Sequence, residues 1–312
     1  MRCLPLADDC GVSNTNTESI FECIDAGALH GTSILACGAA LNTAINGLAK
    51  RLPLNANLRV GVHLNLLEGH CTANPASIPL LVDERGIFKN SLGKLCLTLL
   101  RASPRQKSEL NEQAALEWQA QIELIKSKMR AASDKDVLFY LDGHQHVHAI
   151  PALREALNKI LNQHQFTHVR VPEEARYYVP APPMLQLAGN VRRELLAHWG
   201  KTLRAHLAKI DVPVPNYFIG AFASGAMNYQ RLAAGLGKIA KIAQNNELVE
   251  IMFHPGGYSS QELQKFNKPA KTHLGASSKN VFSAFYAAPE RIVEKNLLLS
   301  KQYQQLLAQY NV

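Results

Sequence analysis

Short β-rich runs alternate with helix-like segments along this chain, and the alternation restricts its fold more than any other feature. We expect strands at 3–7, 32–38, 57–70, 136–148, 167–174 and 246–257, and helices at 14–27, 108–132, 151–164 and 289–309. Strands that alternate with helices in this way pair in parallel. The sequence therefore predicts an α/β fold with a parallel sheet.

Local signals add detail to this expectation. Pro5 favours an edge strand or the first position of a strand, because proline has no N–H to donate. The segment 71–107 lacks strong periodicity, and we expect a small hairpin around Glu84–Gly86 and a turn at 179–184. The helix at 108–132 should bury one face, formed by Trp118, Ile122, Ile125 and Met129.

The chain of 312 residues has 47% hydrophobic content, which suits one large domain or two small ones. No apolar run approaches the roughly 18 residues of a membrane span. The N-terminus reaches two acids within its first nine residues, which is too early for a secretory signal. Six cysteines without a CxxC pair indicate free thiols. We therefore expect a cytoplasmic protein.

The net charge of +8 raises the question of an acidic partner. Part of the charge lies in 190–210 and in scattered lysines from 238 to 279, where it alternates with apolar residues at helical spacing. A solvated helix face accounts for this pattern. Binding of nucleic acid is the alternative, but aromatic–basic interleaving and a helix-turn-helix pattern are both missing.

Polar residues follow the expected strands at the points where they end. They are Asp8 with Asp9, His63, the cluster 144–148, Arg170 and His254. In parallel α/β folds the carboxyl ends of the strands carry the active site. The coincidence predicts that these side chains share one site.

The stretch 142–151, DGHQHVHAIP, places His144, His146 and His148 at alternate positions. These side chains would share a face for as long as the strand persists. Neighbours on one strand face diverge, so three of them are poorly arranged for one ion. One of them, together with His63 and a carboxylate from Asp8 or Asp9, makes a two-histidine, one-aspartate set. That set suits zinc, iron or manganese, and also magnesium with waters.

The adjacent carboxylates allow a division of labour in which one binds the ion and the other acts as a general base. An Asx turn after the strand explains the same pair without any chemistry. His254 precedes Pro255, Gly256 and Gly257, a turn that lets a ligand approach the backbone. There it could act as general acid or stabilise an oxyanion, and the alternative is a hydrogen-bonded loop histidine.

Four stretches in order, ADDCGVS, GVHLNLLEG, DGHQHVHAIP and EIMFHPG, resemble the signature blocks of the YdjC-like carbohydrate deacetylases, which include chitooligosaccharide deacetylases. The blocks span residues 7 to 257. The resemblance implies an irregular (β/α) barrel of the TIM-barrel type in a single domain, 1–312. It also implies a divalent metal and the hydrolysis of an N-acetyl group from a sugar.

The resemblance also assigns roles to individual residues. Asp9, His63 and His144 match the metal ligands, Asp8 matches the catalytic base, and His254 lines the site. The remaining polar residues are expected to contact substrate or the ligands themselves, namely Asp142, His146, His148 and Arg170. Magnesium is the first choice of ion, with zinc or another divalent ion as the alternative.

Two positions depart from the family pattern. Cys10 replaces a common phenylalanine and Gly143 a common serine, and neither position is a ligand by the resemblance. A thiol at Cys10 could make the enzyme sensitive to oxidation, whereas a small buried thiol is the simpler interpretation. The segments 71–107 and 175–245 lie outside the blocks, and we expect these variable insertions to carry substrate choice.

The leading hypothesis is thus a metal-dependent carbohydrate deacetylase that acts on a small-molecule sugar. We expect neither a nucleic-acid nor a membrane partner, and the hypothesis is compatible with a homodimer. A metal-dependent hydrolase of another amide, an ester or a phosphoester is the alternative. A basic binding protein without enzymatic activity is the third hypothesis, and its binding would weaken steeply with salt.

Overall fold

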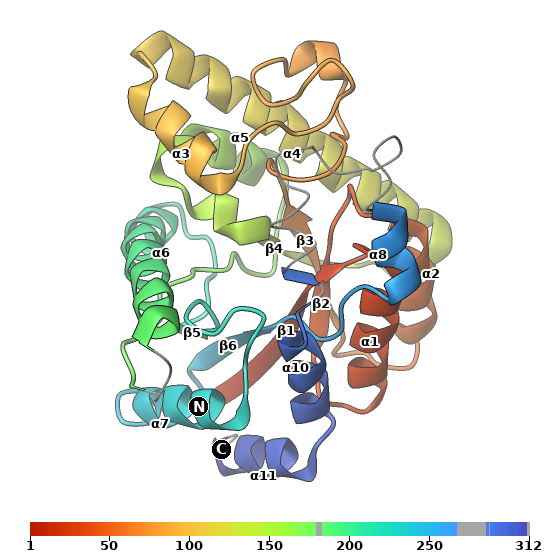
Figure 1. The fold of residues 1–312 in the computed structure, drawn as a ribbon, viewed down its shortest axis with the longest axis vertical. Coiled ribbons are helices and arrows are strands. Elements are labelled where there is room, and N and C mark those ends of the chain that lie inside the picture. The colour runs from red at the N-terminus through yellow and green to blue at the C-terminus, as the bar shows by residue number, and fades with distance from the viewer. Residues whose placement is uncertain (179–182, 267–284, 287, 311–312) are drawn as a thin grey trace.

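The computed structural model describes the chain except residues 179–182, 267–284, 287 and 311–312 (Figure 1). Its centre is a curved sheet of six strands in the order β4-β3-β2-β1-β6-β5. The strands are β1 (Arg2–Cys10), β2 (Gly31–Ile34), β3 (Arg59–Leu64), β4 (Phe139–Gly143), β5 (Tyr217–Ile219) and β6 (Leu248–Phe253). Every neighbouring pair is parallel, which confirms the predicted α/β fold.

The segment 167–174 joins the two edges of this sheet. Val169 bridges Leu141 of β4, and Glu174 bridges Phe218 of β5, both in parallel. Pro172 lies between the two bridges and has no N–H for a ladder. The strand predicted over 167–174 is therefore wrong as a regular strand, but the segment closes the sheet into the irregular barrel that the family resemblance implied.

Helices surround the strands (Figure 1). They are α1 (Asn14–Asp25), α2 (Leu41–Arg51), α3 (Leu92–Arg101), α4 (Pro104–Ala132), α5 (Arg154–Gln163), α6 (Pro183–Lys209), α7 (Tyr229–Ile239), α8 (Ser260–Phe266), α10 (Glu290–Leu298) and α11 (Lys301–Tyr310). In Figure 1, α1 and α2 flank the strands on one side and α6 flanks them on the other. Strands covered by helices are buried, and in β1 every residue after Arg2 is buried.

The long helix α4 confirms the expectation for 108–132 and begins earlier, at Pro104. Ser103 and Gln106 form a capping box there, which satisfies two backbone N–H groups at the helix start. The face predicted to be apolar is buried, and it comprises Trp118, Ile122, Ile125 and Met129. The helix α3, inside 71–107, was not predicted.

The hairpin expected near 84–86 is present, because Val82 and Phe88 form an antiparallel bridge around it, with Gly86 at a φ of 74°. Ile87 also forms an antiparallel bridge with His70. The single helix expected over 289–309 is wrong, because the Ser300 hydroxyl accepts from Tyr303 N and starts α11 as a separate helix. Of the turn expected at 179–184, residues 179–182 lie outside the described part of the chain, and α6 begins at Pro183.

Pro5 corrects a further expectation. It lies within β1, which is an interior strand of the sheet and not an edge. The Pro5 carbonyl accepts from His30 N at 2.8 Å, and the pairing of β1 with β2 begins only at Leu6 and Gly31. The N and O of one strand residue face the same neighbouring strand, so the nitrogen of Pro5 also faces the side of β2. It lies before the first paired residue of β2, and its missing N–H therefore costs no ladder bond.

Within the described ranges, no helix combines the length and the apolar character needed to cross a membrane.

Candidate active site

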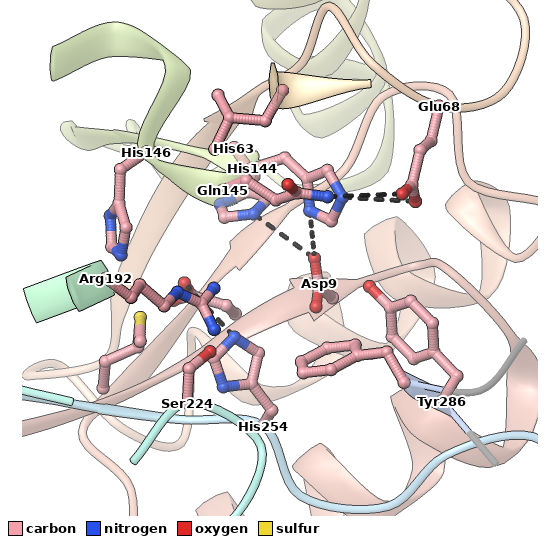
Figure 2. Close-up of a pocket in the computed structure, with 14 residues that line it drawn as sticks. Asp9, His63, Glu68, His144, Gln145, His146, Arg192, Ser224, His254 and Tyr286 are labelled. Carbon is pink, nitrogen blue, oxygen red and sulfur yellow. Dashed lines mark hydrogen bonds and ion pairs between the residues drawn. The ribbon is translucent and has the colours of Figure 1, made fainter. Parts of the chain in front are cut away.

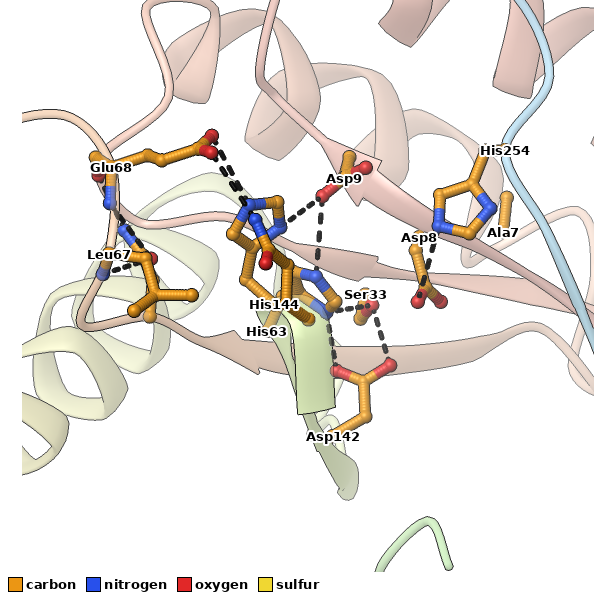
Figure 3. Close-up of polar contacts among 12 residues, drawn as sticks. Ala7, Asp8, Asp9, Ser33, His63, Leu67, Glu68, Asp142, His144 and His254 are labelled. Atoms are coloured by element: carbon orange, nitrogen blue, oxygen red, sulfur yellow. Dashed lines mark hydrogen bonds and ion pairs between the residues drawn. The ribbon is translucent and has the colours of Figure 1, made fainter. Parts of the chain in front are cut away.

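The end of β1 separates the two adjacent carboxylates. Asp9 has a φ of 64°, in the left-handed region, and the pairing of β1 with β2 is irregular between Ala7 and Cys10. A strand broken in this way re-aims its side chains. Asp9 consequently turns toward His63 and His144, whereas Asp8 turns toward His254 (Figure 3). Asp8 also contacts Arg170.

Three side chains converge on one point. Asp9 Oδ1 lies 3.0 Å from His144 Nδ1 and 3.3 Å from His63 Nε2. One ligand atom from each of the three residues lies within 4.8 Å of the others, and all three residues are buried. Two imidazoles and a carboxylate are a suitable donor set for a divalent metal ion. The structure thus brings together the residues that the resemblance assigned to the metal.

Each of these imidazoles meets a second carboxylate on its other nitrogen. His63 Nδ1 donates to Asp142 Oδ1 at 2.8 Å, and Ser33 Oγ donates to Asp142 Oδ2 at 2.9 Å. His144 Nε2 donates to Glu68 Oε2 at 3.2 Å. Asp142 was predicted to orient an imidazole. Glu68 was not predicted, although it stands in the quoted block GVHLNLLEG five residues after His63.

The carboxylates control the charge of the two imidazoles. Burial alone lowers the pKa of His63, but Asp142 and Asp9 outweigh it and raise the pKa to about 10. Burial also lowers the pKa of His144, but Glu68 and Asp9 outweigh it and raise the pKa to about 9. For Asp9, burial raises the pKa, but the hydrogen bonds from His144 and His63 hold it well below its usual value. Asp9 is therefore ionised, and it lies between two imidazoles that are protonated at neutral pH.

Arg170 organises the other half of the site. Its guanidinium is fully buried and lies 2.6 Å from Asp8 Oδ2 and 3.0 Å from Asp142 Oδ2, and its Nε donates to Glu250. The three carboxylates raise the pKa of Arg170 against the effect of burial. Glu250, on β6, was not predicted, because nothing in the sequence shows that it faces the barrel interior.

Asp8 has the charge properties of a base. Burial raises its pKa to about 6, with Arg170 lowering and Asp142 raising it. Its Oδ1 has no hydrogen-bond partner among the described residues. This oxygen is therefore available to a water or a substrate while Oδ2 is held by Arg170.

The histidine block does not continue the strand. β4 ends at Gly143, and a 3₁₀ segment, His144–Ala149, follows, in which Gln145 and His146 have φ angles of 49° and 60°. The strand expected over 136–148 is therefore wrong from His144 onward, and the condition under which the three histidines would share a face is not met. His146 faces the cavity, whereas His148 Nε2 donates to the Arg170 carbonyl at 2.9 Å. Burial lowers the pKa of both residues, so both are neutral.

Gly143 and Cys10 have structural explanations. A Cβ at position 143 would lie 2.8 Å from His148 Nδ1, so a larger residue there would displace His148. Cys10 is fully buried, and burial raises the pKa of its thiol to about 12. Such a thiol stays protonated and unreactive, which favours the structural interpretation of Cys10 over an oxidation-sensitive one.

A cavity of about 330 Å³ opens over these groups (Figure 2). Asp8, Asp9, His63, His144 and His254 line it, so the polar strand ends predicted to share a site do meet. His254 Nε2 lies 3.9 Å from Asp8 Oδ2, and burial holds its pKa well below the usual value. Further lining comes from the two segments outside the motif blocks, through Leu92, Arg192 and Ser224.

Known proteins resemble this chain over most of its length. A family model described as YdjC-like protein matches residues 6–309. A carbohydrate deacetylase of Homo sapiens is 28% identical over 265 residues, which cover 82% of this chain and 75% of that protein. A carbohydrate deacetylase of Danio rerio is 28% identical over 167 residues, or 54% of this chain and about half (48%) of that relative.

A solved structure from Enterococcus faecalis V583, of a candidate cellobiose-phosphate cleavage protein, has a TM-score of 0.64 at 19% identity. The match covers 100% of this chain and 95% of that one. It shows that the two chains share a fold.

Proposed function

This chain belongs to the YdjC-like family, and on that premise we propose that it is a metal-dependent hydrolase that removes an N-acetyl group from an N-acetylated sugar. The observation that carries the proposal is the convergence of Asp9, His63 and His144 on one buried point. Relatives named carbohydrate deacetylase support the choice of bond and substrate.

The three converging side chains would hold the ion. Magnesium is our first choice, and zinc suits the two imidazoles as well. When bound, a divalent ion supplies Lewis acidity, which polarises a carbonyl and lowers the pKa of water. Asp142 accepts from Nδ1 of His63, so that Nε2 of the same ring faces Asp9, where a bound ion would displace the proton of that nitrogen.

Asp8 and His254 would carry the protons. Asp8 lines the cavity, and its Oδ1 has no hydrogen-bond partner among the described residues, so we assign this oxygen the role of taking a proton from the attacking water. Because its pKa is low, His254 is a neutral imidazole whose N–H can donate to the developing oxyanion or to the leaving amine. Arg170 holds Asp8 in place through Oδ2.

Sugar recognition falls to the parts of the chain outside the motif blocks. Leu92 lies in 71–107, and Arg192 and Ser224 lie in 175–245, and all three line the cavity. We propose that these segments of a single domain select the substrate, and that His146, which faces the same cavity, contacts it.

The test is acetate release from N-acetylglucosamine oligomers, measured with and without chelator for the wild-type protein and for His144→Ala. We expect chelator and substitution each to abolish the release. Activity that survives both would exclude the metal mechanism. A parallel panel of other amides, esters and phosphoesters, with phosphate detection, distinguishes the alternative hydrolases, because turnover of one of these without acetate release would replace the sugar amide as the substrate.

A further inference from the structure

Glu68 is a buried carboxylate beside the proposed metal ligands, and the reaction steps leave it without a direct role. Its side chain reaches two consecutive residues after β4. Oε2 lies 3.2 Å from His144 Nε2, and Oε1 accepts from Gln145 Nε2 at 3.3 Å (Figure 2). The residue itself is 5% exposed, so water competes little for these contacts.

The geometry excludes Glu68 from the ligand set. The donor atoms of Asp9, His63 and His144 lie within 4.8 Å of one another, and Glu68 does not belong to that group. It meets Nε2 of His144, whereas Asp9 meets Nδ1 of the same ring. The lone pairs of the two ring nitrogens point away from each other, so Glu68 lies behind the ligand. Since a carboxylate only accepts, Nε2 donates its proton to Glu68, and Nδ1 carries the proton that an ion beside Asp9 would displace.

The loop that carries Glu68 is held firmly in place. Asn65 Oδ1 accepts from Leu67 N at 2.9 Å, and Asn65 Nδ2 donates to the Glu68 carbonyl at 2.6 Å. The backbone of Asn65 is in turn fixed by Gln121 of α4, whose side chain accepts from Asn65 N at 2.9 Å and donates to Asn65 O at 2.8 Å. The backbone that carries Glu68 is therefore held by α4, independently of the histidine turn.

The histidine turn needs such an external hold. Gln145 and His146 are consecutive non-glycine residues in the left-handed region, with φ angles of 49° and 60°. This conformation is unfavourable for L residues and persists only where its surroundings impose it. Glu68 binds the side chain of the first of these residues and the ring of the residue before it.

We propose that Glu68 is the positioning residue of the metal site. It sets the tautomer and orientation of the His144 ring so that Nδ1 faces the ion, and it holds the strained turn that follows. The inference rests on the proposed function, because it assumes that His144 is a ligand. Loss of a carboxylate behind a ligand histidine typically weakens metal binding by roughly 10- to 100-fold, and we expect that range here.

The test measures metal binding directly, without substrate. Zn²⁺ affinity is determined by competition with a chromophoric chelator, at one pH, for the wild-type protein, Glu68→Gln and Gln145→Ala. We expect Glu68→Gln to bind Zn²⁺ roughly 10- to 100-fold more weakly. Gln145→Ala, which keeps the contact with the His144 ring, should lose less. Glu174→Gln is the matched control, because Glu174 is a buried acid that accepts from the backbone of Gly220 and Phe222 and contacts none of the ligands.

A second readout separates positioning from a general loss of structure. Histidine ¹⁵N spectra of the Zn²⁺-loaded wild-type protein should show His144 with its proton on Nε2, and Glu68→Gln should shift this signal while the signals of histidines remote from the site stay in place. Unfolding temperatures without metal show that both Glu→Gln variants fold.

The outcomes distinguish the two proposals. A wild-type protein that binds no divalent ion at all would refute the proposed function. A wild-type protein that binds Zn²⁺, with Glu68→Gln binding equally well or losing no more than Glu174→Gln, would refute the role of Glu68 alone.

Discussion

Replacement of Arg170 by methionine tests the electrostatic core of the barrel. The guanidinium is fully buried and lies between three buried carboxylates, Asp8, Asp142 and Glu250. Methionine keeps much of the apolar stem of the side chain but lacks the guanidinium charge that pairs with all three carboxylates. The three carboxylates would then face one another in a medium where repulsion is weakly screened.

The expected cost follows from this burial. Removing one partner of a buried ion pair typically destabilises a protein by about 3–5 kcal/mol, because the other charge stays buried without compensation. Proteins of this kind have unfolding free energies of about 5–15 kcal/mol. Arg170→Met should therefore lose about 3–5 kcal/mol near pH 8, which is a large part of the total stability.

The loss should depend on pH in a defined direction. Without the guanidinium, the folded-state pKa values of Asp8, Asp142 and Glu250 all rise, and that of Asp8, which burial already raises to about 6, lies further above its value in the unfolded chain, near 4. At pH values between the unfolded-state and folded-state pKa values, the folded variant then binds more protons than the unfolded variant, so its stability falls as the pH rises. The difference from the wild-type protein should consequently be smaller at pH 5 than at pH 8.

Urea unfolding followed by circular dichroism at both pH values measures the effect. Arg85→Met is the control, because Arg85 pairs with Asp83 2.9 Å away at a site where its side chain is 69% exposed. An exposed pair of this kind contributes no more than about 1 kcal/mol. A loss at Arg170 no larger than that of the control, or a loss that is the same at pH 5 and pH 8, would refute the reasoning.

Three further predictions concern the site. His144→Ala should weaken metal binding at least about 100-fold. His148→Ala removes a buried ring and its bond to the Arg170 carbonyl but no proposed ligand, so it should leave the metal affinity nearly unchanged and cost about 1–3 kcal/mol of stability. Equal metal loss for both variants in a binding titration would restore a three-histidine site. Because burial raises the pKa of Asp8 to about 6, kcat/KM for acetate release should climb about tenfold per pH unit below 6 and level off above it, and Asp8→Asn should remove this limb of the profile. Burial raises the pKa of Glu294 to about 7, so the folded protein holds a proton there that the unfolded chain releases near pH 4, and the wild-type protein loses stability as the pH rises. Between pH 5 and pH 8, the stability of Glu294→Gln in urea unfolding should therefore gain up to about 3 kcal/mol relative to the wild-type protein. A difference that stays constant over this range would contradict the assignment.

Much of the architecture was predictable because it depends on local chemistry. The alternation of strands and helices determined the parallel sheet, and the 3.6-residue repeat of 108–132 located the buried face of α4. Polar residues directly after buried runs marked the carboxyl edge of the sheet, which is where Asp9, His63 and His144 meet. These patterns are periodic or adjacent along the chain, so they can be read without knowing the pairing of distant segments.

Other features depend on which strands become neighbours. Pro5 argued for an edge, yet β2 begins only beyond it, so the missing N–H costs nothing in an interior strand. The segment 167–174 has the composition of a strand but changes partner from β4 to β5 around Pro172, so it forms single bridges. A register of this kind is a property of the closed barrel and leaves no local pattern.

The amino-acid pattern was enough to predict the fold class, the edge of the sheet that holds the site, and the residue types that meet there. The partners of each residue follow from the three-dimensional arrangement of the barrel: Asp9 faces the imidazoles, Asp8 faces Arg170, and Glu68 and Glu250 are buried partners from distant loops and strands. The left-handed backbone at Asp9, Gln145 and His146 sets these directions. That backbone is unfavourable locally and is held by contacts across the barrel, so no stretch of the sequence could have predicted it.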